Sequence, residues 1–208
     1  MRHNALLGIF LGLFTAAAIG QGFPPSNVQH NEIAIQYDGV FTAHRGGAPT
    51  HYLATRSGGF LIDYRMHVNS WEAFEVQYGY TRNGQSYFTP ATAAGAPAAN
   101  YYIAANMHQL FVNEVVTTPK FAGFQPFVLG GGGALFFRPR GASAIAASNQ
   151  TRGAFDYGVG LDFTVDHIGA RIEYRGLIFK VPDFGNPLLT TDRWTHVAQP
   201  SVGLVFTF

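Results

Sequence analysis

The sequence predicts an all-β fold: an eight-stranded antiparallel up-and-down transmembrane β-barrel that follows an N-terminal signal peptide. Three observations lead to this prediction. Charged residues make up only 12% of the 208 residues, whereas 15% are aromatic and 25 residues are glycine, which is unusual for a water-soluble enzyme. Hydrophobic residues recur with a period of two in successive segments, which indicates strands. An uncharged apolar run stands at the N-terminus.

This N-terminal run has the layout of a secretory signal peptide. Arg2 gives a positive start, residues 5–19 are uncharged, and small residues precede an expected cleavage point after Gly20. A membrane anchor is the alternative, but the run is shorter than the roughly 20 residues that span a bilayer. We expect a signal peptide at 1–20, a periplasmic tail at 21–31 and the barrel domain at 32–208.

The strands alternate apolar and polar faces from the start of this domain. In residues 32–42, Ile35 and Tyr37 alternate with Gln36 and Asp38, and residues 61–69 and 74–81 show the same period around a tight turn at Asn69. Residues 101–116 are less regular, which predicts a bulge near His108. The remaining strands are expected at 125–137 (around Gly130–Gly133), 154–164, 170–178 and 194–208.

The connections between these strands alternate long and short, beginning with a long loop at 42–59. The other long loops are expected at 82–100, 138–153 and 180–193. Outer-membrane barrels have short periplasmic turns and longer external loops. A soluble ligand-carrying barrel would share the period of two, but strands of this length suit a tilted crossing of a bilayer.

The C-terminal strand carries the most specific pattern. Residues 201–208 read S-V-G-L-V-F-T-F, with Ser201, Gly203, Phe206 and a terminal Phe208. With residues 71–80 (W-E-A-F-E-V-Q-Y-G-Y), 155–162 and 171–175, this segment resembles the small eight-stranded outer-membrane β-barrel family, similar to OmpA- and OmpX-like barrel domains. The resemblance implies an outer-membrane location, a porin-like architecture and recognition of the last strand by the barrel-assembly machinery. It fixes no function, since members include anchors, adhesins, narrow pores and enzymes.

Charged residues of the polar faces are the first candidate site. An eight-stranded barrel is just wide enough for side chains to fill it, so these residues would meet inside and pair. The expected interior charge network is Asp63, Arg65, Glu75, Asp156, Asp162, Arg171, Glu173 and Arg175. A filled polar core is the preferred interpretation, and a narrow gated path for small solutes or ions is the alternative.

A lipid-modifying enzyme is the third interpretation, and no catalytic residue is expected. Its nucleophile and base would have to share one face, whereas His196 and Ser201 are five residues apart and lie on opposite faces of a regular strand. His30, His44 and His51 lie in tail or loop without metal-ligand spacing, so neither a metal nor a cofactor is expected. The absence of Cys excludes disulfides and thiol chemistry, and a net charge of +1 gives no case for nucleic acid.

Arginines are unevenly distributed in the long loops. They fall in or beside the first three loops, where no Asp or Glu accompanies them. Because arginine suits phosphate, we expect lipopolysaccharide contacts. The arginines with this expected role are Arg45, Arg56, Arg138 and Arg140, with Arg82 and Arg152 nearby. The sequence therefore predicts a monomeric, non-enzymatic outer-membrane barrel with a structural or surface-interaction role, whose partners are outer-membrane lipids and lipopolysaccharide.

Overall fold

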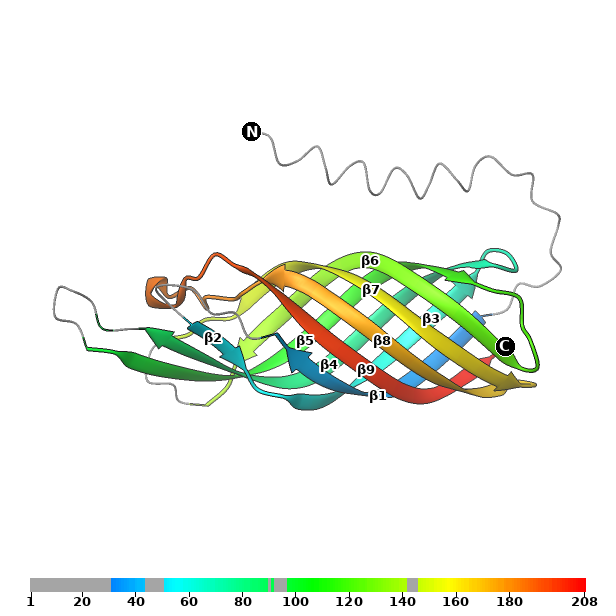
Figure 1. Ribbon diagram of the computed structural model, residues 1–208, viewed down its shortest axis with the longest axis horizontal. Coiled ribbons are helices and arrows are strands. Elements are labelled where there is room, and N and C mark those ends of the chain that lie inside the picture. The colour runs from blue at the N-terminus through cyan, green and yellow to red at the C-terminus, as the bar shows by residue number, and fades with distance from the viewer. Residues whose placement is uncertain (1–30, 44–50, 90, 92–96, 142–145) are drawn as a thin grey trace, which may run out of the picture.

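The computed structural model describes residues 31–43, 51–89, 91, 97–141 and 146–208, and it is a closed antiparallel barrel (Figure 1). The expected signal peptide, the tail before Asn31 and the loop residue Arg45 lie outside the described residues. The strands are β1 (Asn31–Thr42), β2 (His51–Ala54), β3 (Ser57–His67), β4 (Glu72–Thr89), β5 (Ala99–Thr117), β6 (Phe124–Pro139), β7 (Gln150–Val165), β8 (Ile168–Lys180) and β9 (Trp194–Thr207).

All strands except β2 form the barrel wall, which confirms the predicted eight-stranded fold. Strands adjacent in the barrel pair in antiparallel register, and β1 also pairs with β9 to close the wall. At this seam the backbone N–H of Asn31 donates to the carbonyl of Phe208 at 2.8 Å. Closure pairs the backbone of every wall strand on both sides, which is the condition for a sheet to cross lipid.

The two ends of the barrel differ, as the alternation of loop lengths predicts. Short turns and the two chain ends of the barrel domain lie at one end, and the longer connections lie at the other (Figure 1). Because outer-membrane barrels keep their short turns in the periplasm, the first end is the periplasmic end and the second is the outer end. The described chain has one 3-10 helix, η1 (Pro187–Leu189), and no helix with the length and hydropathy to cross a bilayer.

The strands reach further at the outer end than the sequence predicts. β4 continues to Thr89 and β5 begins at Ala99, so much of the predicted loop 82–100 is a paired hairpin that stands out from the barrel (Figure 1). β2 pairs with this extension of β4. The extension was not predicted because residues 82–86 (R-N-G-Q-S) are polar or glycine, as loop residues are, and show no alternation of apolar side chains.

The bulge lies at a different place from the predicted one. Register along β4 shifts by one residue between β2 and β3, so Thr55 and Arg56 form a bulge between those strands. β5, by contrast, pairs without interruption through His108, which lies opposite Tyr80 and Phe136. The prediction of a bulge near His108 is wrong: this strand has polar residues on both faces and keeps its period.

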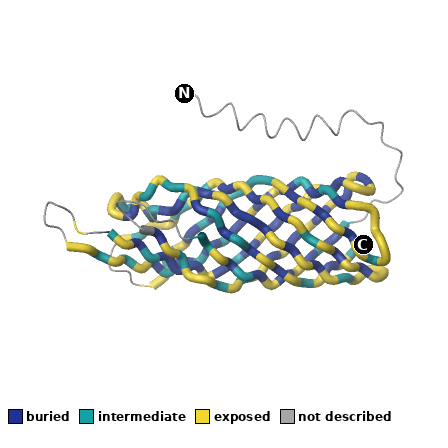
Figure 2. The backbone as a smooth tube through the Cα atoms, in the orientation of Figure 1, coloured by how far each residue is buried: buried dark blue, intermediate teal, exposed yellow. Residues whose placement is uncertain are grey.

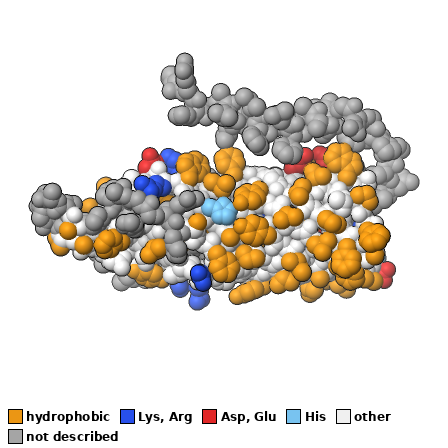
Figure 3. All heavy atoms as spheres, viewed as in Figure 1, with side chains coloured by type: hydrophobic (Ala, Val, Ile, Leu, Met, Phe, Trp, Pro, Cys, Tyr) orange, Lys and Arg blue, Asp and Glu red, His pale blue; other side chains and the backbone are white. Residues whose placement is uncertain are grey.

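Burial alternates residue by residue along the wall (Figure 2), and apolar side chains cover its outer surface (Figure 3). Ile62, Val112 and Val202, for example, are 41%, 57% and 54% exposed. In a soluble protein this would be a large unfavourable apolar surface, whereas in lipid it is the favoured one. The predicted outward apolar face is therefore the lipid-facing wall.

The interior is only partly polar, which corrects the expectation of a polar core. Phe127, Leu129, Leu135 and Phe137 of β6 share one apolar face, and this face points inward. Charged side chains fill the periplasmic half, and an apolar cluster fills the outer half. The period of two shows that two faces exist but does not tell which of them is inside when both are apolar.

Candidate functional site

A network of ion pairs fills the periplasmic half of the barrel. The predicted charged residues meet there, each no more than 4% exposed. They come from strands β3, β4, β7 and β8. Residues two apart on a strand project to the same side of the sheet, so each of these strands can direct its charged residues inward together. The members are Asp63, Arg65, Glu75, Asp156, Asp162, Arg171, Glu173 and Arg175.

Arg175 lies at the centre of the network. Its Nη2 donates to Glu75 Oε1 at 2.6 Å, its Nη1 donates to Asp156 Oδ2 at 3.3 Å, and its Nε donates to Glu173. Three strands are thereby tied together through one fully buried guanidinium. The planar fork of arginine suits several carboxylates at once, which the point charge of lysine would not.

Arg65 and Arg171 form a second layer with shared partners. Arg65 Nη2 donates to Glu75 Oε2 at 2.8 Å and its Nη1 to Asp162 Oδ2 at 3.2 Å. Arg171 Nε donates to Asp162 Oδ1 at 2.7 Å. Both guanidinium groups also lie over the ring of Phe127, at 4.3 and 5.1 Å from its centroid. Desolvated contacts of this kind are among the stronger cation–π interactions.

Glu32 and Phe127 belong to this network although they were not predicted in it. Glu32 accepts from Arg171 Nη2 at 3.0 Å and lies 3.2 Å from the Nε2 atom of His67. Its place on the polar face of β1 was a usable signal, since the same face carries Gln36, which donates to Asp63 at 2.5 Å. Phe127 gave no such signal, because its neighbours Pro126 and Val128 are apolar as well and do not show which face is inside.

The network contains more carboxyl groups than cations. Three arginines face six carboxyl groups, the sixth being Glu32. One oxygen in each of Asp63, Asp156 and Glu173 has no hydrogen-bond partner among the described residues. The surplus is negative, so the interior field attracts cations and repels anions.

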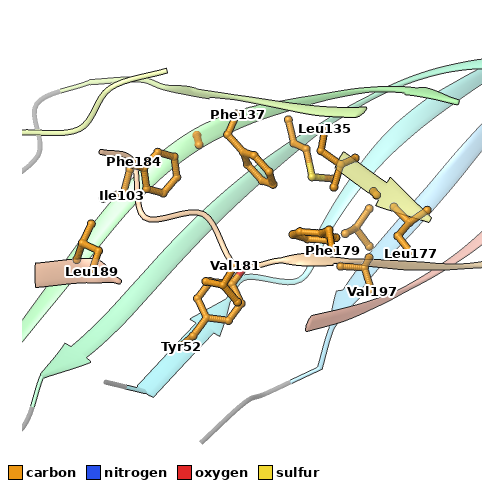
Figure 4. Packing of buried hydrophobic residues seen from close by; sticks show 14 of the residues in the cluster. Tyr52, Ile103, Leu135, Phe137, Leu177, Phe179, Val181, Phe184, Leu189 and Val197 are labelled. Atoms are coloured by element: carbon orange, nitrogen blue, oxygen red, sulfur yellow. The ribbon is translucent and has the colours of Figure 1, made fainter. Parts of the chain in front are cut away.

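An apolar cluster closes the outer half. Figure 4 shows Phe137, Phe179 and Leu177 of the wall in one cluster with Phe184 and Leu189, which belong to the connection 181–193 between β8 and β9. The ring of Phe137 lies 5.9 Å from that of Phe179 and 6.3 Å from that of Phe184. We call this connection the lid. Phe184 is 1% exposed and Leu189 is fully buried, so the lid fills the barrel mouth instead of projecting away from it.

Hydrogen bonds fix the lid to the wall. Gln150 Oε1 accepts from the backbone N–H of Asp183 and of Phe184 at 2.9 and 3.0 Å, and Tyr87 donates to the Pro182 carbonyl at 2.6 Å. Arg152 forms an ion pair of 3.0 Å with Asp183. Burial alone would raise the pKa of Asp183, but the hydrogen bond from Gln150 and the charge of Arg152 hold that pKa below its usual value.

The loop arginines separate into two groups. Arg152 is engaged by the lid, whereas Arg56, Arg138 and Arg140 are exposed at the outer end, together with Arg82. None of the described residues forms an ion pair with these four exposed side chains. The sequence identified Arg82 as one of the loop arginines. It was predicted at the start of the loop 82–100, whereas the structure places it on β4.

Neither protein-family models nor curated proteins match this sequence at a significant level. Solved structures do match it. Neisserial surface protein A is 10% identical with a TM-score of 0.60, covering 86% of this chain and 97% of its own. OprG from Pseudomonas aeruginosa is 11% identical with a TM-score of 0.55, covering 87% of this chain and 96% of its own. Ail from Yersinia pestis is 16% identical with a TM-score of 0.53, covering 86% of this chain and 99% of its own.

This chain has the fold of a small outer-membrane β-barrel. At these identities the likeness concerns the fold alone. In this barrel the closing strand presents Val202, Leu204 and Phe206 outward, whereas Ser201 points inward and donates to Gln36 Oε1 at 2.9 Å. Gly203 is required at the seam, since a Cβ there would lie 2.1 Å from the Ile35 carbonyl.

Histidines of the barrel wall have partners other than serine. His196 points outward and lies 3.0 Å from the Tyr157 hydroxyl, on the opposite face from Ser201. His108 lies 2.8 Å from the Tyr78 hydroxyl in the same outward orientation. These pairs lie toward the outer edge of the apolar wall, where amphipathic rings are favoured.

Proposed function

We propose that this protein is a closed, non-enzymatic outer-membrane barrel with a structural or surface-interaction role. One observation carries the proposal: the interior is filled twice, by the ion network toward the periplasm and by the apolar cluster under the lid toward the outside. A barrel of eight strands has room for side chains but not for a wide channel as well. A binding function would then lie on the outward surface of the wall or at the outer end of the barrel.

The outer end supports a surface role. The hairpin of β4 and β5, with β2 at its side, forms a small sheet beyond the apolar wall. Its inward face packs Tyr52 and Tyr87 over the lid, and its outward face leaves Leu53 and Tyr102 about half exposed, at 45% and 54%. Exposed apolar side chains that lie together on a surface are typical of binding sites. Since the wall itself has no open edge, we infer that the barrel acts as a monomer.

A narrow pore is the alternative, and planar-bilayer conductance decides between the two. The barrel would be refolded, with folding verified by its heat-dependent shift on gels. We expect no channel steps from the folded wild-type protein. Discrete, reproducible steps would overturn the closed-barrel proposal.

Two variants make this experiment sharper. Arg175→Ala removes the central guanidinium of the network, and Lys180→Ala removes a cation from an exposed ion pair on the same strand. Because the apolar cluster still closes the outer half, the closed-barrel proposal predicts no channel steps from either variant. If the network were the only seal, Arg175→Ala alone would leak, and the surplus of carboxylates would make that leak cation-selective. A wild-type protein that conducts and changes its conductance in Arg175→Ala would favour the pore.

The last strand has a separate proposed role in biogenesis. Ser201, Gly203, Phe206 and Phe208 fit a closing-strand pattern, and we propose that the assembly machinery recognises them. Phe208 is 60% exposed, so its loss removes no packing from the interior. Phe208→Ala should therefore lower the amount of barrel assembled in cells without lowering the stability of barrel refolded in vitro. Equal assembly in cells would contradict this role.

A further inference from the structure

The exposed arginines at the outer end are aligned across neighbouring strands. Arg82 of β4 lies opposite Asn106 of β5, and Asn106 lies opposite Arg138 of β6. These three side chains form one outward row across the wall. Arg82 and Arg138 belong to different predicted loops, so only strand pairing brings them together.

A second row follows one step further out. Arg140 donates its backbone N–H to the Ala104 carbonyl at 2.8 Å, and Ala104 lies opposite Gly84. Arg56 stands on the other side of Gly84, at the bulge whose Thr55 N–H donates to the Gly84 carbonyl at 2.8 Å. Because Gly84 and Ala104 are small, the two arginines flank a stretch of wall without long side chains of its own.

The position of these rows relative to the lipid-facing wall is the second observation. The row directly below Arg82 is Tyr80, His108 and Phe136, in which the rings of Tyr80 and His108 lie 5.1 Å apart. Successive outward residues are about 7 Å apart along a strand. The first row of guanidinium groups therefore lies about 7 Å beyond a row of aromatic side chains, and aromatic rows of this kind mark the membrane interface. In Figure 3 basic side chains lie between the apolar wall and the outer hairpin.

Charge and partnering point to an anionic ligand at this depth. The four arginines have no carboxylate partner among the described residues, unlike Arg152, which pairs with Asp183. Arginine binds phosphate through two parallel N–H donors, and basic clusters at a membrane surface select anionic headgroups. A zwitterionic headgroup would leave most of this charge unbalanced.

We propose that Arg56, Arg82, Arg138 and Arg140 bind the phosphate groups of lipopolysaccharide in the outer leaflet, on the sector of the wall formed by β4, β5 and β6. Binding there would hold this sector of the wall against lipopolysaccharide and keep the outer hairpin at the membrane surface. It does not depend on whether the interior conducts, so the proposal and the closed-barrel function can fail separately.

The test is a binding titration with purified lipopolysaccharide against the full barrel in zwitterionic detergent micelles. The site variant is Arg82→Gln/Arg138→Gln. Its matched control is Lys120→Gln/Lys180→Gln, which removes the same charge from the periplasmic turn after β5 and from an exposed ion pair. Folding of each variant is checked by the heat-dependent gel shift, and the substitutions lie at exposed positions.

We expect the site variant to bind lipopolysaccharide about tenfold or more weakly than wild type, because each basic residue near an anionic surface adds to its affinity. The control should bind within about twofold of wild type. We also expect wild type to lose a similar factor with lipopolysaccharide whose phosphates have been removed. Equal weakening of both variants, or undiminished binding of the dephosphorylated lipid, would overturn the proposal. So would full displacement of the lipid by a soluble polyanion at low concentration, since the partner would then be a soluble glycan.

Discussion

Replacement of Arg175 by alanine tests the energetic role of the ion network. Among the described residues, Arg175 alone contacts Glu75, Asp156 and Glu173 together, and its removal leaves these carboxyl groups buried beside Asp63. Loss of one partner from a buried ion pair costs about 3–5 kcal/mol, since an uncompensated charge stays behind. We expect the free energy of unfolding to fall by about that amount. The charge-retaining Arg175→Lys should lose less, because it keeps the cation but not the fork.

Lys180→Ala is the matched control on the same strand. Lys180 and Asp192 are 2.7 Å apart, but their side chains are 45% and 77% exposed. Solvent screens such a surface pair, so its loss should change the free energy of unfolding very little. Unfolding by urea in detergent micelles, followed through the fluorescence of the two tryptophans, gives both values. If Arg175→Ala lost no more stability than Lys180→Ala, the network would not hold the periplasmic half together as argued.

Three further predictions concern the lid and the wall. Phe184→Ala removes a side chain that is 1% exposed and should raise the rate of proteolysis within the lid, whereas Leu188→Ala, at 58% exposure, should leave that rate unchanged; equal rates would mean that Phe184 does not anchor the lid. The lowered pKa of Asp183 means that its contribution to lid stability is present above the ordinary aspartate value of 3.8 and is lost as pH falls through the lower folded value; hydrogen exchange of the lid amides should accelerate there in wild type but show no such step in Asp183→Asn. Gly131→Ala places a Cβ 2.2 Å from the Val112 carbonyl and should impair refolding, whereas Gly153→Ala meets nothing within 4 Å and should refold as wild type; normal refolding of both variants would contradict the close approach of β5 and β6.

The sequence determined the fold because alternate residues of each strand in a membrane barrel face lipid and the interior, and these two environments favour different residue types. Ile35, Tyr37, Gln36 and Asp38 already separate the lipid-facing from the inward face of β1, and the structure places them accordingly. The number of alternating segments gave the strand count, and the lengths of the connections gave the orientation, since external loops are longer than periplasmic turns. Alternation and loop length are local features, so they can be recognised in the sequence without knowing which strands pair.

Only the tertiary structure decided which residues meet inside. Phe127 lies under two arginines and Phe184 fills the barrel mouth, although one comes from an apolar strand and the other from a predicted loop. The row of Arg82 and Arg138 likewise depends on the register of β5 between them. Register sets which side chains are neighbours across strands, and it is fixed by closure of the whole barrel and not by any one strand. The sequence therefore separates the two faces of each strand and identifies the inward one where one face is polar, whereas the closed wall decides the inward face of an apolar strand such as β6 and the neighbours of every residue.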